Sequence, residues 1–162
     1  VIGIDFCERM LHKAKNKGAN NVDFALAMAE SLPFPDDTFD CATIGFALRN
    51  VTDVPKTIQE MVRVTKTGGR VICLETSQPS NKLFNTIYRF YIFYILPLIG
   101  ALISRKKYAY SYLPQSIVEF LTLDELKQIM GRSGLKDIQT HSLSWGIATV
   151  HAGTKETRSE RK

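Results

Sequence analysis

The alternation of short apolar runs with amphipathic segments restricts the fold of this chain more than any other feature. Four runs bounded by turn residues are expected to be strands: residues 1–5, 22–27, 39–46 and 70–76. Segments 6–17 and 58–65 place apolar side chains at helical spacing instead. Strands and helices in alternation, joined by short turns, predict an α/β fold with a parallel sheet.

Composition agrees with a globular protein and narrows the partners only slightly. The chain has 162 residues, which suits one domain, and 44% of them are apolar, which suits a real core. The net charge of +5 fits nucleic acid or anionic lipid head groups and does not choose between them. The three cysteines lie far apart without CxxC spacing, which argues against a disulfide framework or a metal site.

Residues 83–103 form the most apolar part of the chain. The uninterrupted stretch 90–103 is shorter than the roughly 20 residues that a bilayer span needs. We expect two helices broken at Pro97, which either form a lid on the domain or lie in a membrane interface. The cations at 105–107 suit acidic lipid head groups and equally suit a solvated turn, so both alternatives stay open.

The carboxyl-terminal part predicts a capped helix followed by two strands. Thr122 and Glu125 have the spacing of a capping box, and segments 135–143 and 147–153 read as a closing strand pair. We therefore expect one domain over 1–154, with 80–121 as a lid or insertion that contacts the substrate. The polar residues 155–162 are expected to be a disordered tail.

Several residues after the predicted strands suit a nucleotide ligand. Asp5 ends the first strand, where an acid either binds ribose hydroxyls or caps the next helix. Small Ala29 lets the backbone approach a flat base, and small Gly45 leaves room near the end of another strand. Tight packing is the alternative explanation for both small residues.

Arg49 and Asn50 follow the third predicted strand at its carboxyl end, where open α/β sheets bind ligands. A guanidinium there can stabilise an enolate or phenolate as it forms, or hold a water that takes the proton. A surface ion pair of a loop arginine is the alternative.

Four segments together resemble one known family. They read LPFPDDTFDCATIGFALRNVTD, TGGRVICLETSQP, YSYLPQSI and GIATVHAG. In this order and spacing they are similar to the UbiE/MenG family of ubiquinone and menaquinone C-methyltransferases, from Val1 to about Lys155. The LETSQP segment is most similar to the corresponding segment of demethylmenaquinone methyltransferases.

The resemblance implies a class I, Rossmann-like fold dependent on S-adenosylmethionine (SAM). It implies methyl transfer from SAM to a ring carbon of a prenylated quinol, demethylmenaquinol to menaquinol, in menaquinone biosynthesis. It assigns Arg49 and Asn50 to catalysis, and four positions to the cofactor: Asp5, Met28, Ala29 and Gly45. No metal is implied. Candidates to hold the ring and the prenyl tail are Tyr88, Tyr91, Tyr108 and Tyr112.

The sequence departs from the family pattern in three places. Met28 stands where the family has Asp or Asn, so a hydrogen bond to the adenine amine is lost. The turn reads TKTGG instead of KPGG. The family's first strand and its glycine-rich loop do not occur, so we expect an N-terminally incomplete domain with two exposed inner sheet edges and weak SAM binding.

Other functions and partners stay open at this stage. A ubiquinone-pathway or other lipophilic acceptor, such as a sterol or tocopherol precursor, would suit the same fold. A non-catalytic fragment that only binds a partner would suit the absent loop. We expect a cytoplasmic protein with peripheral contact at the inner face of the cell membrane, self-association into a homodimer, and no nucleic-acid partner.

Overall fold

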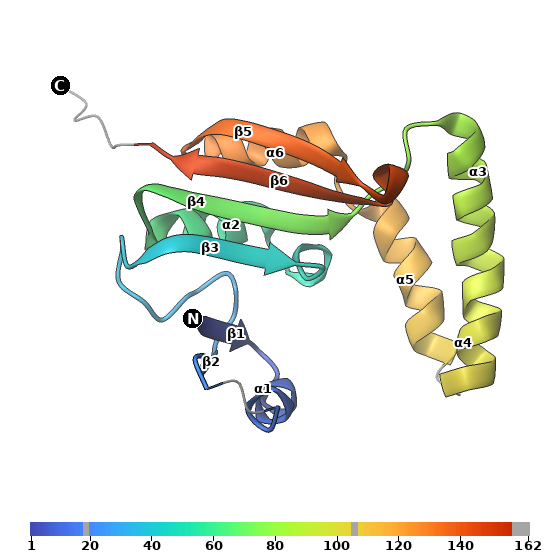
Figure 1. The fold of residues 1–162 in the computed structure, drawn as a ribbon, viewed down its shortest axis with the longest axis horizontal. Helices are drawn as coiled ribbons and strands as arrows, with labels where there is room; N and C mark the ends of the chain where they lie inside the picture. Colours follow the sequence, from blue (N-terminus) through green and yellow to red (C-terminus); the bar gives the residue numbers. More distant parts are fainter. Residues whose placement is uncertain (18–19, 105–106, 157–162) are drawn as a thin grey trace.

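The computed structural model describes residues 1–17, 20–104 and 107–156, and the side chains of these residues except 101–112. The strands form two separate sheets (Figure 1). The smaller sheet pairs two parallel strands beside helix α1 (Glu8–Lys15): β1 (Ile2–Asp5) and β2 (Asp23–Leu26). The larger sheet has, in spatial order, β3 (Phe39–Gly45), β4 (Thr65–Thr76), β6 (Ala148–Lys155) and β5 (Leu135–Leu143).

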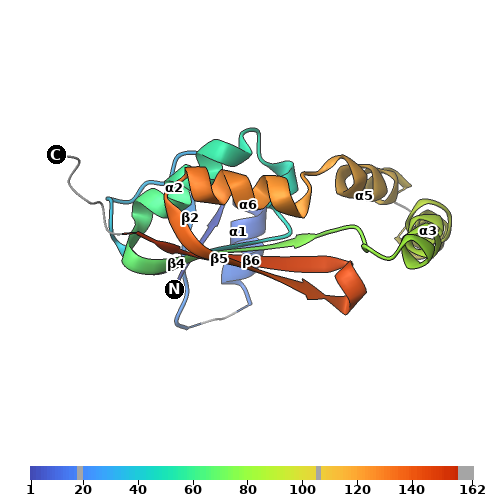
Figure 2. The ribbon, with the colours of Figure 1, turned by 90° about the horizontal axis from the view of Figure 1, so that it is seen from above.

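Helices α2 (Val54–Val64) and α6 (Leu123–Arg132) cover the same face of the larger sheet (Figure 2). Both begin at side-chain caps. Asp53 accepts a hydrogen bond from the backbone of Lys56 at 2.9 Å, and Thr122 forms the predicted capping box with Glu125. Each cap fixes where its helix starts. The apolar stripe of each helix faces the sheet, with Ile58 and Met130 fully buried.

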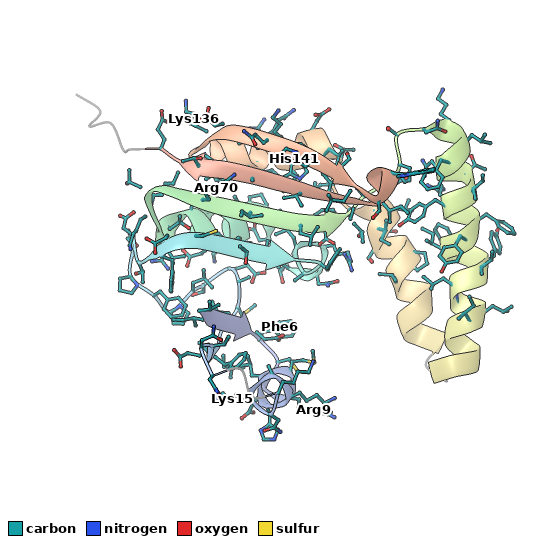
Figure 3. The ribbon with its side chains drawn as sticks, in the orientation of Figure 1. Phe6, Arg9, Lys15, Arg70, Lys136 and His141 are labelled. Atoms are coloured by element: carbon teal, nitrogen blue, oxygen red, sulfur yellow. The ribbon has the colours of Figure 1, made fainter. Side chains whose placement is uncertain are left out.

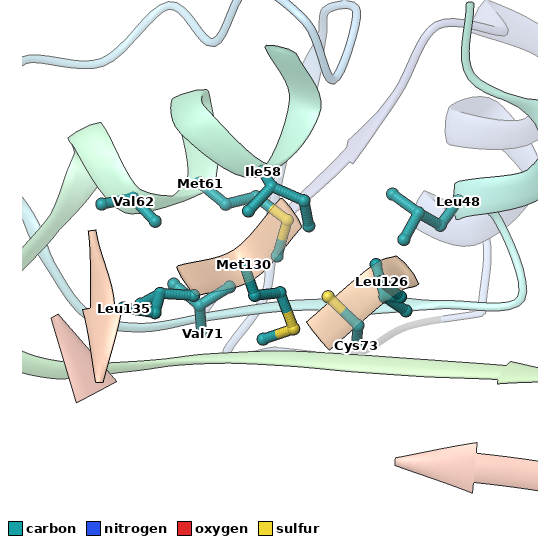
Figure 4. Packing of buried hydrophobic residues seen from close by; sticks show 9 residues of the cluster. All are labelled: Leu48, Ile58, Met61, Val62, Val71, Cys73, Leu126, Met130 and Leu135. Carbon is teal, nitrogen blue, oxygen red and sulfur yellow. The ribbon is translucent and has the colours of Figure 1, made fainter. Parts of the chain in front are cut away.

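The core lies between these two helices and the sheet (Figure 4). Strand β4 supplies alternate residues to it, with Val71 and Cys73 fully buried. Burial raises the pKa of the Cys73 thiol to about 12, so the thiol packs as a neutral apolar group. The remaining members of the cluster are Leu48, Ile58, Met61, Val62, Leu126, Met130 and Leu135.

A helical hairpin extends from the larger sheet at the carboxyl end of β4 (Figures 1 and 2). Its first arm runs without a break through α3 (Lys82–Phe90), a π-helical turn η2 (Tyr91–Ile95) and α4 (Leu96–Ser104). Its second arm is α5 (Lys107–Glu119).

The predicted break at Pro97 is wrong. The amide of Leu96 bonds to the carbonyl of Tyr91, five residues back, so the turn before Pro97 is wider than an α-turn. This widened turn gives the proline ring the room that a regular helix lacks, and the helix continues.

The turn predicted at Gly68–Gly69 lies inside β4 as an irregularity. The pairing of β3 with β4 shifts between Phe39 and Cys41, opposite this segment. Gly68 has a φ of +77°, and a Cβ at Gly69 would lie 2.7 Å from the carbonyl oxygen of Asp40. The left-handed backbone at Gly68 favours glycine, and the lack of space at Gly69 requires it.

Strands β1 and β3 have no hydrogen-bonded partner on their second edges among the described residues. These are the two edges expected from the sequence to lack a neighbouring strand. Correspondingly, Ile2 and Ile4 of β1 are each 37% exposed, although their pattern is that of a buried strand. Lys155, the first residue of the predicted tail, ends β6, and 157–162 lie outside the described residues.

Candidate active site

The topology gathers the predicted site residues at one edge. Strands β1 and β2 run parallel, as do β3 and β4, and β1, β3 and β4 point the same way in Figure 1. Asp5 ends β1, and Met28 and Ala29 follow β2, whereas Gly45 ends β3 and Arg49 follows it. All of them therefore lie at carboxyl ends of parallel strands, where open α/β sheets bind ligands.

Asp5 lies beside the segment that follows β2. The amide of Ala27 bonds to the Asp5 carbonyl at 3.2 Å, which brings Met28 and Ala29 next to the aspartate. Oδ1 of Asp5 accepts a hydrogen bond from the amide of Cys7 at 2.8 Å, ahead of α1. No described residue donates to Oδ2, so one carboxylate oxygen supports the local turn and the other is free for a ligand hydroxyl.

A hydrogen bond links the segment after β2 to the loop after β3. Glu30 follows Ala29, and its Oε1 accepts a bond from the amide of Thr52 at 2.8 Å. Thr52 lies two residues after Asn50. The two groups of predicted site residues are thus neighbours through one carboxylate, a contact that the sequence analysis missed.

Arg63 of α2 fixes the loop between β2 and β3. Its guanidinium donates to the carbonyl oxygens of Leu32 and Phe34, at 3.0 and 2.8 Å. It also pairs with Glu60, which accepts a bond from the amide of Leu32 at 2.9 Å. The hydrogen bond from Arg63 lowers the pKa of the Glu60 carboxyl. The loop that follows Met28 is therefore held to the main sheet by a charged pair.

Arg49 is positioned by a buried carboxylate. It lies in a short 3₁₀ turn, η1 (Leu48–Asn50), whose first residue is fully buried in the core. The guanidinium forms an ion pair with Glu75 at the end of β4 and donates to Thr76 Oγ1 at 3.1 Å. The Arg49 and Glu75 side chains are only 10% and 4% exposed, so this pair is buried and is not the surface pair considered from the sequence.

Glu75 is a site residue that the sequence analysis missed. Its position along β4 could have identified it from the sequence. Val71, Cys73 and Glu75 are spaced by two and point to the same covered face of β4. A carboxylate at such a position requires a partner, because an unpaired buried charge is very costly.

Tyr88 of α3 lies close to this ion pair. Burial raises the pKa of the Tyr88 phenol, and the positive charge of Arg49 opposes that rise. Tyr91 is 42% exposed. Tyr108 and Tyr112 belong to α5, but their side chains lie outside the described residues.

The edge beside Gly45 is open to solvent. A Cβ at Gly45 would meet no atom of the described residues within 4 Å, and Met28 and Asn50 are both exposed. Two surface hollows lie elsewhere, one between α1 and β2 and one along α3, and neither is lined by Asp5 or Arg49. The predicted site is an exposed strand edge with a buried charged pair at one end.

The profile of the ubiE/COQ5 methyltransferase family matches residues 1–155. This chain belongs to that family. It is 41% identical over 163 residues to a demethylmenaquinone methyltransferase of Staphylococcus haemolyticus, covering 99% of this chain and 68% of that protein. It is 42% identical to a ubiquinone/menaquinone biosynthesis C-methyltransferase of Geobacter sulfurreducens, covering 96% of this chain and 62% of the relative.

Solved structures confirm the predicted fold class for this family member. A SAM-dependent methyltransferase from Thermotoga maritima has a TM-score of 0.65 at 23% identity, over 96% of this chain and 72% of that one. A Haloferax volcanii putative methyltransferase, in complex with an activator, has a TM-score of 0.70 at 14% identity, over 99% and 73%. The fold is that of class I SAM-dependent methyltransferases. The methyl donor of this protein is therefore SAM.

The residues at the edge fit the adenosine part of SAM. The free oxygen of Asp5 suits a ribose hydroxyl, the exposed side chain of Met28 suits a flat apolar ring, and Gly45 has open space beside it. The fit rests on one acceptor, one apolar surface and one unobstructed strand end, all at the same edge.

Proposed function

We propose that this protein transfers a methyl group from SAM to a ring carbon of a prenylated quinol, converting demethylmenaquinol to menaquinol. The observation that carries the proposal is the buried Arg49–Glu75 pair next to Tyr88, at the sheet edge that also gathers Asp5 and Met28. Membership of the ubiE/COQ5 methyltransferase family supports the same reaction.

SAM, when bound, supplies the methyl group. Asp5 would hold the ribose through its free carboxylate oxygen, and Met28 and Ala29 would flank the adenine. Gly45 would keep the strand end clear. These contacts would fix the donor at the edge and leave the side of Arg49 for the acceptor.

Arg49 would stabilise the oxyanion of the quinol. Glu75 and Thr76 engage its Nη1, and among the described residues Nε and Nη2 have no hydrogen-bond partner. These N–H groups would donate to the quinol oxygen as its proton passes to a water molecule, which raises the electron density at the neighbouring ring carbon. Asn50 would orient the ring or this water, and Tyr88 would line the acceptor side.

A labelled methyl group tests this function. The purified protein is incubated with SAM carrying a labelled methyl and with demethylmenaquinol, and the extracted quinol is analysed. We expect label on the ring carbon. Arg49→Gln should lower kcat by about 10²–10³-fold, because one preorganised donor to the oxyanion is lost. The matched control is Arg70→Gln, which changes an exposed arginine of β4 (Figure 3).

Two results would contradict the proposal: no label in the quinol, or equal rates for the wild type and Arg49→Gln. Label found only in an added ubiquinone precursor, or in a sterol or tocopherol precursor, would favour another lipophilic acceptor. A protein that binds neither SAM nor quinol would favour the non-catalytic alternative.

We propose that the protein is cytoplasmic and makes peripheral contact with the inner face of the cell membrane, because a prenylated acceptor dissolves in lipid. Fractionation of cells tests this location. Self-association into a homodimer stays a prediction, which the molecular mass in solution tests.

A further inference from the structure

The first arm of the helical hairpin exposes an apolar stripe. Five residues at helical spacing lie on one face of α3, η2 and α4 and are between 58% and 74% exposed: Leu83, Ile87, Phe90, Tyr94 and Leu98. We call these five residues the hairpin stripe. An exposed helix face of a soluble protein is normally polar. A contiguous apolar face of this kind marks a surface that another molecule covers.

The opposite face of the same helix is already packed. Tyr88 and Ile92 are 7% and 3% exposed. The side chains of this arm project away from the sheet as well as towards it (Figure 3). Since the helix already uses its inner face against its own domain, the hairpin stripe is a second, outward face.

An exposed tryptophan extends this surface. Trp145 lies in η3 (Ser144–Gly146), the turn between β5 and β6, and is 84% exposed. Its ring contacts Phe84 of α3, with 5.5 Å between ring centroids. Tryptophan has an apolar body with a polar N–H, which suits the boundary between water and lipid.

The backbone holds Trp145 outward at a conformational cost. Ser144 and Trp145 have φ of 48° and 62°, a left-handed region that side chains disfavour. Ser77, directly after β4, clamps this turn: its Oγ donates to the carbonyl of Gly146 at 2.8 Å, and its amide bonds to the carbonyl of Ile147 at 2.8 Å. The exposed tryptophan is thus fixed beside the start of α3.

The segment of the chain that contains the hairpin stripe has charged residues of one sign only. The sequence contains no Asp or Glu from 77 to 118, and the same segment carries five cations: Lys82, Arg89, Arg105, Lys106 and Lys107. Arg89 lies within the stripe region, with its guanidinium 5.7 Å from the ring centroid of Phe93. An anionic lipid surface complements this charge. Two copies of the surface facing each other would instead bring like charges together.

The length of the helix does not decide between crossing a bilayer and lying on it. The helix Lys82–Gly100, 19 residues long, is long and apolar enough to cross, with a mean hydropathy of 1.3 over its most apolar window of 18 residues. Two observations favour the interface: the arm packs Tyr88 and Ile92 on protein, and Arg89 lies near its middle. An amphipathic helix with cations beside its apolar face lies in the plane of the interface.

We propose that the hairpin stripe and Trp145 together form a docking surface for an anionic lipid bilayer, with the first arm of the hairpin lying in the interface. The proposal refines the peripheral membrane contact proposed above and rests on it for its biological setting. Its structural basis is independent of methyl transfer.

The single tryptophan of the chain makes a direct test available. The protein is titrated with vesicles of phosphatidylglycerol and phosphatidylcholine, and separately with vesicles of phosphatidylcholine alone. We expect a blue shift of the Trp145 emission, quenching by brominated lipid, and binding to the anionic vesicles roughly tenfold tighter or more. High salt should weaken the binding, because it screens the exposed charges.

A double variant, Leu83→Glu with Leu98→Glu, should lower vesicle binding more than about tenfold, since two exposed apolar contacts become repulsive charges. Both positions are exposed, so the fold should be kept, and circular dichroism checks it. Phe6→Glu is the matched control, because Phe6 is 76% exposed but lies in the smaller sheet unit (Figure 3). Tyr94→Glu provides a second variant on the same face.

Three outcomes would overturn the proposal. They are the absence of a fluorescence shift with anionic vesicles, equal binding to both vesicle types, and a dimer in solution that the double variant dissociates. The last outcome would assign the surface to a second copy of the chain. A protein that binds vesicles but transfers no methyl group would contradict the proposed function and leave the docking surface standing. Methyl transfer without vesicle binding would support the proposed function and contradict the docking surface.

Discussion

The larger sheet and the β1–α1–β2 unit have similar apolar patterns in sequence but differ strongly in burial. In the larger sheet, Val71 and Cys73 are fully buried under α2 and α6. In the smaller unit, Ile2 and Ile4 are 37% exposed and Phe6 is 76% exposed. The hydrogen bonds of 1–26 stay within 1–27 among the described residues. An apolar run therefore forms a core only where a covering helix and neighbouring strands surround it.

The largest expected difference between the two regions is in local stability. Amides of β1 and β2 should exchange with solvent through local opening, whereas those of β4 should require nearly global unfolding, a difference of several kcal/mol out of about 5–15. Hydrogen–deuterium exchange with mass spectrometry measures it. Equal protection of the two sheets would show that they unfold as one unit.

A matched pair of methionines sharpens the comparison. Met130 of α6 is fully buried, and Met10 of α1 is 55% exposed. Met130→Ala should lower the free energy of unfolding by about 2–5 kcal/mol, because it leaves a cavity in the core. Met10→Ala should change it by less than about 0.5 kcal/mol. Urea titration of both variants checks this, and similar losses would refute the assigned burial.

The Arg49–Glu75 pair should show the next largest effect. Glu75→Ala leaves a largely buried guanidinium without its partner and should cost about 3 kcal/mol. The paired change Arg49→Met with Glu75→Leu should recover most of the loss, since no buried charge then remains. Lys136→Ala, which breaks an exposed pair with Glu156, should cost less than about 1 kcal/mol. If Glu75→Ala cost no more than Lys136→Ala, the pair would not be buried in solution.

The smallest expected effect is a pH dependence of the free energy of unfolding, which arises in the larger sheet. His151 of β6 is 1% exposed, its Nε2 bonds to the Leu123 carbonyl at 3.1 Å, and its buried Nδ1 has no partner among the described residues. Burial lowers the pKa of His151 below 6.5, so the folded state keeps the imidazole neutral while the unfolded chain takes up a proton. Stability should be complete above about pH 6.5 and should fall below it, by at most about 1.4 kcal/mol per pH unit.

His151→Gln should flatten this pH dependence between pH 6.5 and 5, whereas the exposed His141→Gln should leave it in place (Figure 3). Unfolding midpoints in urea at several pH values measure the slope. A slope that persists in His151→Gln would assign the dependence to another group.

Features set by local sequence were predictable. The capping box of Thr122 and Glu125 involves residues three apart, so the pattern alone specifies it. The same holds for the order of strands and helices. The placement of Asp5 and Arg49 at strand ends also follows from that order, because parallel strands share one carboxyl edge.

Features set by contacts between distant residues were not predictable in the same way. Arg49 and Glu75 are 26 residues apart, and Glu30 and Thr52 are 22 apart, with no periodicity to connect them. The continuous helix through Pro97 depends on a π-turn, which no simple sequence rule signals.

The double contact of Ser77 with the Trp145 turn joins segments that are 69 residues apart in the chain. Together with the contact between the Trp145 and Phe84 rings, it holds the indole beside the first turn of α3, so on a bilayer the two would move together along the bilayer normal. The immersion depth of the indole would then report the depth and tilt of the neighbouring helix, and one spectroscopic reading would locate both.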